Sequence, residues 1–109
     1  MDITITGRKM PITDALRSYA EEKIGNSMKV MDISPLTAEV VLQVEKNPAN
    51  PTPATCEVTM RARGHIIRVE EREENMYAAI DVAAAKALRQ LRKYKTRVID
   101  KKIAQAPAE

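Results

Sequence analysis

The sequence predicts an α+β domain in two layers, with the element order β-α-β-β-β-α. Four segments alternate apolar and polar residues, and two longer segments repeat apolar residues at helical spacing. Each alternating segment offers one apolar face, and two amphipathic helices are available to cover it. We therefore expect a four-stranded sheet with both helices packed on one face and the other face exposed to water.

The first strand and the first helix can be placed from the opening third of the chain. Ile3 and Ile5 alternate with polar residues up to Gly7, which predicts a short strand. Thr13 is a suitable N-cap, because its hydroxyl can accept a hydrogen bond from a first-turn amide. The spacing predicts an amphipathic helix over residues 14–31, whose apolar positions are Leu16, Ala20, Ile24 and Met28.

Two further strands should flank a proline-rich loop. Apolar and polar residues alternate over residues 37–45 and again over 54–62. Residues 46–53 hold three prolines and two asparagines, a composition that cannot continue a β ladder. The one cysteine, Cys56, lies on the apolar side of the third strand. We expect it to be a small buried residue in a reduced protein rather than part of a disulfide or a metal site.

The last strand should lead directly into the second helix. Gly64 and His65 are predicted to form a turn, after which Ile67 and Val69 occupy the buried side of the strand. Asn75 is the expected N-cap of the helix. Negative charge before that position suits the helix dipole, and it is supplied by Glu70, Glu71, Glu73 and Glu74.

The charge of the last third of the chain is its strongest functional feature. Residues 86–102 hold eight Lys or Arg and one Asp, a net charge of 8 − 1 = +7 in a chain of only +3. At about 100° per residue, one quadrant of the helix holds Lys86, Arg89, Lys93 and Arg97. Roughly 145° away lie the apolar residues Ile80, Ala84, Ala87, Leu91, Tyr94 and Val98. A rigid row of cations can neutralise the phosphates of RNA or DNA and release their counterions.

Catalytic and metal-binding patterns are missing from the sequence. His65 is the only histidine and has no nucleophile motif around it, and the three glycines are scattered. The acids of residues 70–74 do not form a calcium-loop pattern. We therefore expect no enzyme activity, no cofactor, no metal and no small-molecule substrate. No apolar run reaches about 18 residues and no signal peptide is recognisable, so we expect a cytoplasmic protein without a membrane partner.

The aromatic residues narrow the expected mode of nucleic-acid binding. The chain has no Phe or Trp, and Tyr19, Tyr77 and Tyr94 lie at or beside the apolar faces of the helices. Few aromatic side chains are therefore available to stack on bases, which favours recognition of the backbone and shape of the nucleic acid. The element order also resembles the double-stranded RNA-binding domain, in which the second helix carries basic residues near its N-terminus. Here the cations begin about three turns later, which argues against that docking mode.

Several segments resemble the ribosome hibernation-promoting factors, the family that includes ribosome-associated inhibitor A. They are residues 12–19 (ITDALRSY), 40–46 (VVLQVEK), 76–81 (MYAAID) and 89–95 (RQLRKYK), and the resemblance covers about residues 1–102 in order. It implies a domain that occupies the decoding channel of the small ribosomal subunit, blocks messenger and transfer RNA binding and inhibits translation. By position, it implies RNA contacts at Lys86, Arg89, Arg92, Lys93, Lys95 and Arg97. A second group lies on or near the first helix, at Arg8, Lys9, Arg17, Lys23 and Lys29.

We accordingly expect residues 1–103 to form a ribosome-binding domain that is monomeric off the ribosome, and residues 104–109 to form a flexible tail. The chain resembles a short family member or the N-terminal domain of a long one. Three alternatives remain open: a general RNA-binding module, charge that is purely structural, and a protein-binding regulator of a sigma factor, which older names of the resembled family suggest. The regulator would use residues 70–74 or the water-exposed face of the sheet.

Overall fold

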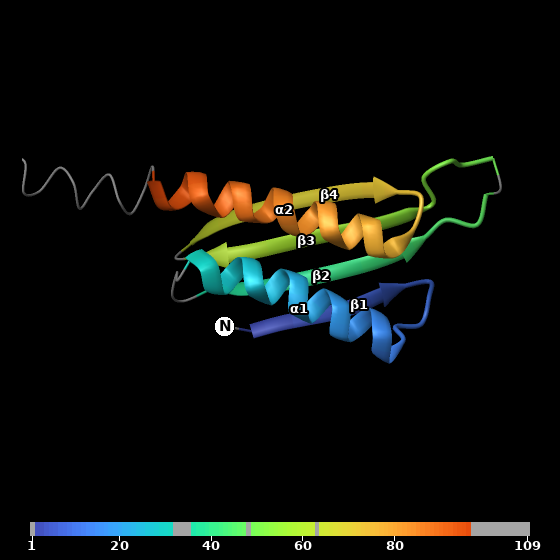
Figure 1. Ribbon diagram of the computed structural model, residues 1–109, viewed down its shortest axis with the longest axis horizontal. Helices are drawn as coiled ribbons and strands as arrows, with labels where there is room; N and C mark the ends of the chain where they lie inside the picture. Colours follow the sequence, from blue (N-terminus) through green and yellow to red (C-terminus); the bar gives the residue numbers. More distant parts are fainter. Residues whose placement is uncertain (1, 32–35, 48, 63, 97–109) are drawn as a thin grey trace, which may run out of the picture.

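A computed structural model describes residues 2–31, 36–47, 49–62 and 64–96. The expected order β-α-β-β-β-α is confirmed, and the helices and strands are shown in Figure 1. They are β1 (Asp2–Arg8), α1 (Asp14–Met31), β2 (Thr37–Val44), β3 (Ala54–Ala62), β4 (His65–Glu73) and α2 (Met76–Tyr94). Arg97, Val98 and the expected tail over residues 104–109 lie outside the described residues.

The four strands form a mixed sheet in sequence order, β1-β2-β3-β4. β1 and β2 are parallel because α1 carries the chain back between them, while the other two pairs are antiparallel. The register places one buried apolar residue of each strand in a row across the sheet. This row consists of Ile5, Val40, Val58 and Val69.

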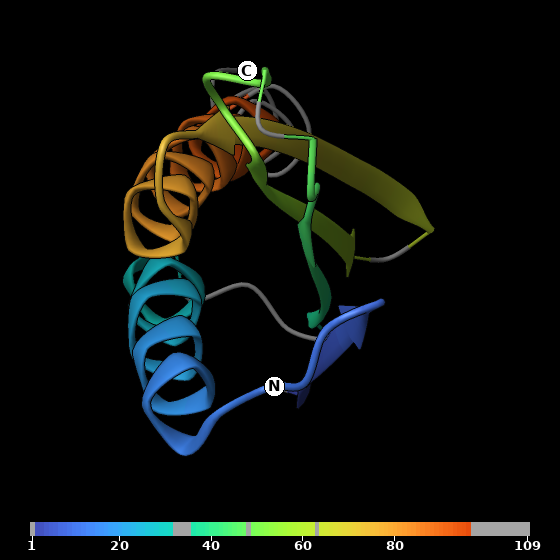
Figure 2. The same cartoon turned by 90° about the vertical axis from the view of Figure 1, so that its right-hand side faces the viewer.

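Both helices cover the same face of the sheet, as expected, and Figure 2 shows the two layers end-on. Ile24 and Met28 of α1 and Ile80 and Leu91 of α2 are fully buried between the layers. The helices run in the same direction (Figure 1), and the hydroxyl of Ser27 in α1 donates to the carbonyl oxygen of Ala84 in α2 at 3.2 Å. The opposite face of the sheet is left open.

The helix starts are those expected from the sequence. The side-chain oxygen of Thr13 accepts a hydrogen bond from the amide of Leu16 at 3.1 Å. The side chain of Asn75 accepts one from the amide of Ala78 at 2.9 Å. Each cap satisfies an amide that has no partner inside the helix, which fixes where the helix begins.

The predicted turn at Gly64 and His65 is only partly right. Gly64 has a positive φ of 81° and makes the turn, whereas His65 is already the first residue of β4. The ring of His65 stacks on that of Tyr94, with 4.6 Å between centroids and 19° between planes. Because the hydroxyl of Tyr94 also donates to the carbonyl oxygen of Ala62 at 3.4 Å, the C-terminal end of α2 is attached to the ends of β3 and β4.

Candidate nucleic-acid interface

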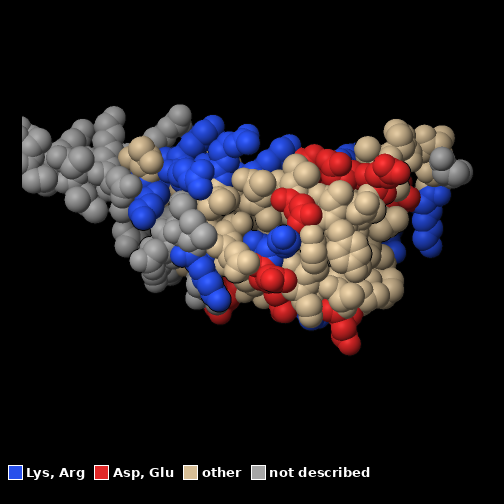
Figure 3. Space-filling model, in the orientation of Figure 1, with Lys and Arg blue, Asp and Glu red and all other residues tan. Residues whose placement is uncertain are grey.

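α2 has the two faces that the sequence predicts. Its buried side includes Ile80, Ala84, Ala87, Leu91 and Tyr94. The exposed side carries Lys86, Arg89, Arg92 and Lys93. In Figure 3, basic side chains gather over the C-terminal half of α2, while acidic ones gather near its N-terminal end. The helix therefore presents cations to solvent while its apolar side holds it to the sheet.

Three cations of α2 surround a hollow near the end of the helix. Arg89, Arg92, Lys93 and Thr96 line this hollow, which has a volume of about 340 Å³. None of the three basic side chains forms an ion pair with a carboxylate among the described residues. An anion can therefore approach them without displacing any carboxylate of the described residues.

Lys86 differs from its neighbours because it has an acidic partner. Its ammonium group contacts a carboxylate oxygen of Glu71, whose side chain is only 13% exposed. Glu71 lies on the side of β4 that α2 covers, since neighbouring residues of a strand point to opposite faces. The charge pattern of residues 86–102 does not predict this pair. The acid comes from the sheet, not from the helix.

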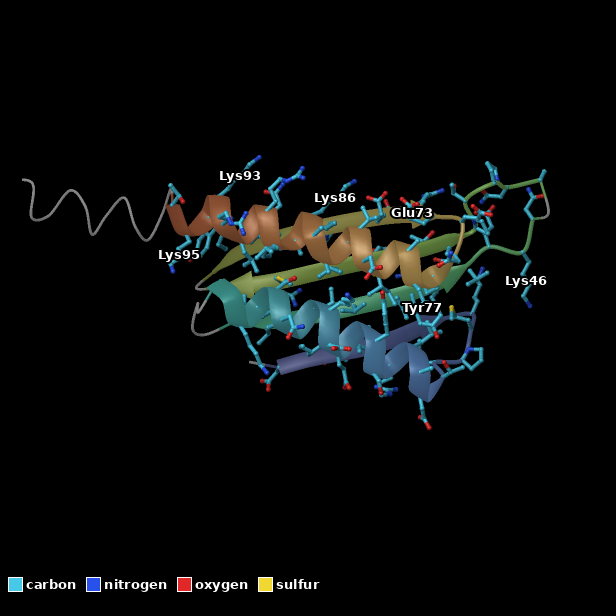
Figure 4. All side chains as sticks on the ribbon, viewed as in Figure 1. Lys46, Glu73, Tyr77, Lys86, Lys93 and Lys95 are labelled. Atoms are coloured by element: carbon cyan, nitrogen blue, oxygen red, sulfur yellow. The ribbon has the colours of Figure 1, made fainter. Side chains whose placement is uncertain are left out.

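Lys95 lies away from the other cations. It is the C-cap residue of α2 and is half-buried. Figure 4 shows its side chain on the opposite flank of the helix from that of Lys93. Arg97 lies outside the described residues, so the described cations on the outer side of the helix run from Lys86 to Lys93.

Two of the remaining predicted contacts, Arg8 and Lys9, are not part of this surface. Arg8 lies on the open face of the sheet, where it pairs with Glu57 at 3.4 Å. Lys9 has a left-handed backbone, with φ of 61°, and lines a separate hollow together with Lys46. In Figure 4, Lys46 lies at the opposite end of the molecule from Lys93.

The cations of α1 are spread around the helix and balanced by acids. Arg17 and Lys29 are exposed, whereas Lys23 pairs with Asp81 of α2 at 3.7 Å. The net charge of α1 is 3 − 3 = 0, against 4 − 1 = +3 for α2. Of the three α1 candidates, Lys29 belongs to the last turn, which lies at the same end of the molecule as the cations of α2 (Figure 1).

Two tyrosines join the helices at their outer surface. The rings of Tyr19 and Tyr77 meet edge to face, with 4.9 Å between centroids. The hydroxyl of Tyr19 donates to Asp81 at 2.7 Å, and this hydrogen bond to a carboxylate raises the pKa of Tyr19. Tyr77 keeps 43% of its surface exposed. The expected position of these tyrosines beside the apolar faces is confirmed.

A second hollow, not expected from the sequence, lies between β4 and α2. Its volume is about 330 Å³. Its lining brings one arginine of the sheet, Arg68, close to two cations of the helix. The lining residues are Arg68, Val69, Glu70, Lys86, Arg89 and Gln90.

The open face of the sheet is neutral and largely paired with itself. Its described strand residues include four arginines (Arg8, Arg61, Arg68, Arg72) and four acids (Asp2, Glu39, Glu57, Glu70), whose formal charges sum to 4 − 4 = 0. Three of the arginines form ion pairs with Glu57, Glu39 and Glu70. A strongly charged partner therefore finds no excess of either sign on this face.

The parts of the chain that the structure describes contain neither a metal-binding cluster nor a membrane-spanning helix. No group of three or more His, Cys, Asp or Glu side chains could hold a metal ion there. Neither described helix combines the length and the apolar composition needed to cross a bilayer. Cys56 is buried and unpaired, as expected.

The chain is a small two-layer α+β protein whose second helix carries a cluster of exposed cations. The chain matches, over residues 3–99, the family described as sigma 54 modulation protein / S30EA ribosomal protein. It belongs to this family, which confirms the resemblance found in the sequence. The family is named for modulation and for the ribosome rather than for a reaction, in agreement with the expectation that the chain is not an enzyme.

Three curated relatives carry closely related names. The chain is 36% identical to the ribosome hibernation promoting factor of Azotobacter vinelandii over 109 residues, 100% of this chain and 96% of that protein. It is 35% identical to the ribosome hibernation promotion factor of Picosynechococcus sp. over 94% of this chain and 53% of that protein. It is 40% identical to that of Staphylococcus aureus over 86% of this chain and 48% of that protein. The chain thus spans about half the length of the last two relatives.

Solved structures share the fold. The N-terminal domain of Thermus thermophilus Protein Y superposes with a TM-score of 0.72 at 34% identity, covering 86% of this chain and 99% of that one. A ribosomal subunit interface protein from Coxiella burnetii also gives a TM-score of 0.72, at 24% identity, over 89% of this chain and 100% of that one.

Proposed function

We propose that this protein is a ribosome hibernation factor that binds the RNA of the small ribosomal subunit in the decoding channel. There it blocks the binding of messenger and transfer RNA and so inhibits translation. The names of its curated relatives support the ribosome as the target. The observation that carries the proposal is the exposed set Arg89, Arg92 and Lys93, which has no carboxylate partner among the described residues.

The proposed mechanism is occlusion, in which no covalent bond is made or broken. The cations of α2 bind phosphates of the RNA backbone, which fixes the orientation of the domain on the RNA. Because Ile80, Leu91 and Tyr94 hold the helix against the sheet, little backbone freedom remains to be lost on binding. The folded body then fills space that the RNA ligands of translation need. In this proposal the protein is cytoplasmic and is a monomer when it is not bound to the ribosome. It uses no cofactor.

The test of the proposal is sedimentation with purified small subunits. The variant is Arg89→Glu, Arg92→Glu and Lys93→Glu combined, which reverses three exposed charges and should leave the fold intact. Lys86 is left unchanged, because a glutamate there would face the buried carboxylate of Glu71 and disturb the fold. We expect the wild type to co-sediment with small subunits and the triple variant to remain in the supernatant.

The matched control has the same change in net charge at other places. Lys9→Glu, Lys46→Glu and Arg61→Glu reverse three exposed cations that lie after β1, in the β2–β3 loop and in β3. This control should still co-sediment, with a circular dichroism spectrum like that of the wild type. Loss of binding by both variants, or by neither, would contradict the assignment to α2.

The position on the subunit is tested by competition. Initiator transfer RNA together with messenger RNA should displace the protein from small subunits, and simultaneous binding would rule out the decoding channel. Equal affinity for a free RNA duplex would instead support a general RNA-binding module. Sigma-factor binding that survives the triple change on α2 would support the protein-binding regulator.

A further inference from the structure

One arginine of the open sheet face, Arg68, has no acidic partner in the described part of the chain. Arg8, Arg61 and Arg72 pair with glutamates on the same face at 3.4, 3.9 and 3.9 Å. Arg68 pairs with no described carboxylate, although it lies on the same strand as Arg72 and opposite Thr59 of β3. Three of these arginines thus have a glutamate partner on the sheet face, whereas Arg68 has none among the described residues.

Arg68 lies at the edge of the sheet next to α2. β4 is the last strand of the sheet, and its outer edge has no neighbouring strand among the described residues. There Arg68 lines the hollow of about 330 Å³ together with Arg89 and Gln90 of α2. A basic side chain from the sheet and one from the helix therefore face the same space.

The other two charged residues of this hollow, Lys86 and Glu70, already have ion-pair partners. Lys86 contacts the buried carboxylate of Glu71, and Glu70, the only acid of the lining, pairs with Arg72 at 3.9 Å. Arg68 and Arg89 are thus the two cations left for an external anion. Guanidinium groups bind phosphate oxygens with paired, directional hydrogen bonds, and the amide of Gln90 can donate another.

We propose that the hollow between β4 and α2 holds one phosphate of the RNA backbone, and that Arg68 is an RNA contact. This inference rests on the proposed function and extends it to a second structural element. The bound RNA then follows the cations of α2 and crosses the outer edge of β4 at Arg68. The interface is a surface formed by a helix and a sheet edge, rather than by the helix alone.

The experiment compares Arg68→Ala with Arg61→Ala in binding to small subunits over a series of salt concentrations. Both residues are exposed arginines of the same sheet face, but of the two only Arg61 pairs with an acid among the described residues. We expect Arg68→Ala to bind about tenfold more weakly than the wild type. Its plot of log affinity against log salt should be shallower by about one unit. Arg61→Ala should match the wild type.

A third variant should act in the opposite direction. Glu70→Gln removes the only acid of the lining and should strengthen binding. Equal binding by Arg68→Ala and the wild type would overturn the inference, as would equal weakening by Arg68→Ala and Arg61→Ala. In both cases the proposed function would stand, provided that the triple α2 variant still failed to bind. A wild type that does not bind small subunits would overturn the proposed function and this inference together.

Discussion

The ammonium group of Lys86 on α2 contacts the carboxylate of Glu71 on β4, and the two residues differ in burial. The side chain of Glu71 is 13% exposed, whereas that of Lys86 is 48% exposed. The lysine therefore neutralises an acid that α2 covers when it packs on the sheet. Lys86, which the family resemblance implies as an RNA contact, therefore also stabilises the packing of α2 on the sheet.

This difference in burial predicts which partner is more costly to remove. Lys86→Met leaves a mostly buried carboxylate without its cation and should lower the free energy of unfolding by about 1–3 kcal/mol. Glu71→Gln leaves an exposed lysine that water can solvate, so its cost should be less than about 1 kcal/mol. Urea unfolding of the two variants measures both values.

The double variant provides the control for this pair. Lys86→Met combined with Glu71→Gln should be more stable than Lys86→Met alone, because no uncompensated carboxylate remains. If Glu71→Gln were as destabilising as Lys86→Met, Lys86 would not be compensating a buried charge.

The buried thiol of Cys56 should not react in the folded protein. Burial raises the pKa of Cys56 to about 12, so the reactive thiolate is scarce at neutral pH. Folding stability from this group should be fully present below its usual pKa of 9.0 and lost as the pH rises toward 12. Labelling by a thiol-specific disulfide reagent at pH 8 should be slow, and urea should accelerate it. Fast labelling of the native protein would contradict this burial.

The hydrogen bond between Tyr19 and Asp81 predicts a change in tyrosine ionisation. Asp81→Ala removes the acceptor and should lower the pKa of Tyr19 toward its usual value of 10.0. Because the folded protein raises this pKa, the contribution of Tyr19 to stability is present below pH 10 and is lost above it. Absorbance titration of the phenolate, with Tyr19→Phe to assign the signal, measures the change. An unaltered titration in Asp81→Ala would exclude the contact.

Tyr94 should hold the cationic end of α2 in place. Tyr94→Ala removes a buried ring and should lower the free energy of unfolding by about 3–5 kcal/mol. Tyr94→Phe loses only the hydrogen bond to Ala62 and should cost about 1 kcal/mol. Hydrogen exchange should show lost protection in the last turns of α2 in the alanine variant, more than in α1. A uniform loss throughout the protein would argue against a local anchor.

Much of the fold follows from local rules that act within one element. Thr13 and Asn75 could be recognised as caps because a cap depends on a few neighbouring residues. The alternation that buries Val40 and Val58, and the helical repeat that buries Ile80 and Leu91, also depend only on spacing.

The candidate site was harder to predict because its contacts join elements that are distant in the chain. The pairing of Lys86 with Glu71 depends on how α2 lies over β4, which spacing within the helix does not specify. The place of Arg68 beside Arg89 depends on the same packing. Lys95 could have been separated from the row by spacing alone, because at about 100° per residue it falls roughly 180° from Lys86. Its inclusion rested on the family resemblance.

The salt dependence of binding to small subunits is the sharpest test of RNA binding by α2, because cations that neutralise phosphates release the counterions of the RNA. If about four described cations each neutralise one phosphate, the slope of log affinity against log salt should be roughly −3 to −3.5 for the wild type. Any residual binding by the variant with Arg89, Arg92 and Lys93 changed to glutamate should have a slope of about −1 or shallower, because only about one of the four cations remains. A steep wild-type slope that this variant loses is the predicted result. A flat wild-type slope, or one that the triple change leaves intact, would contradict the account.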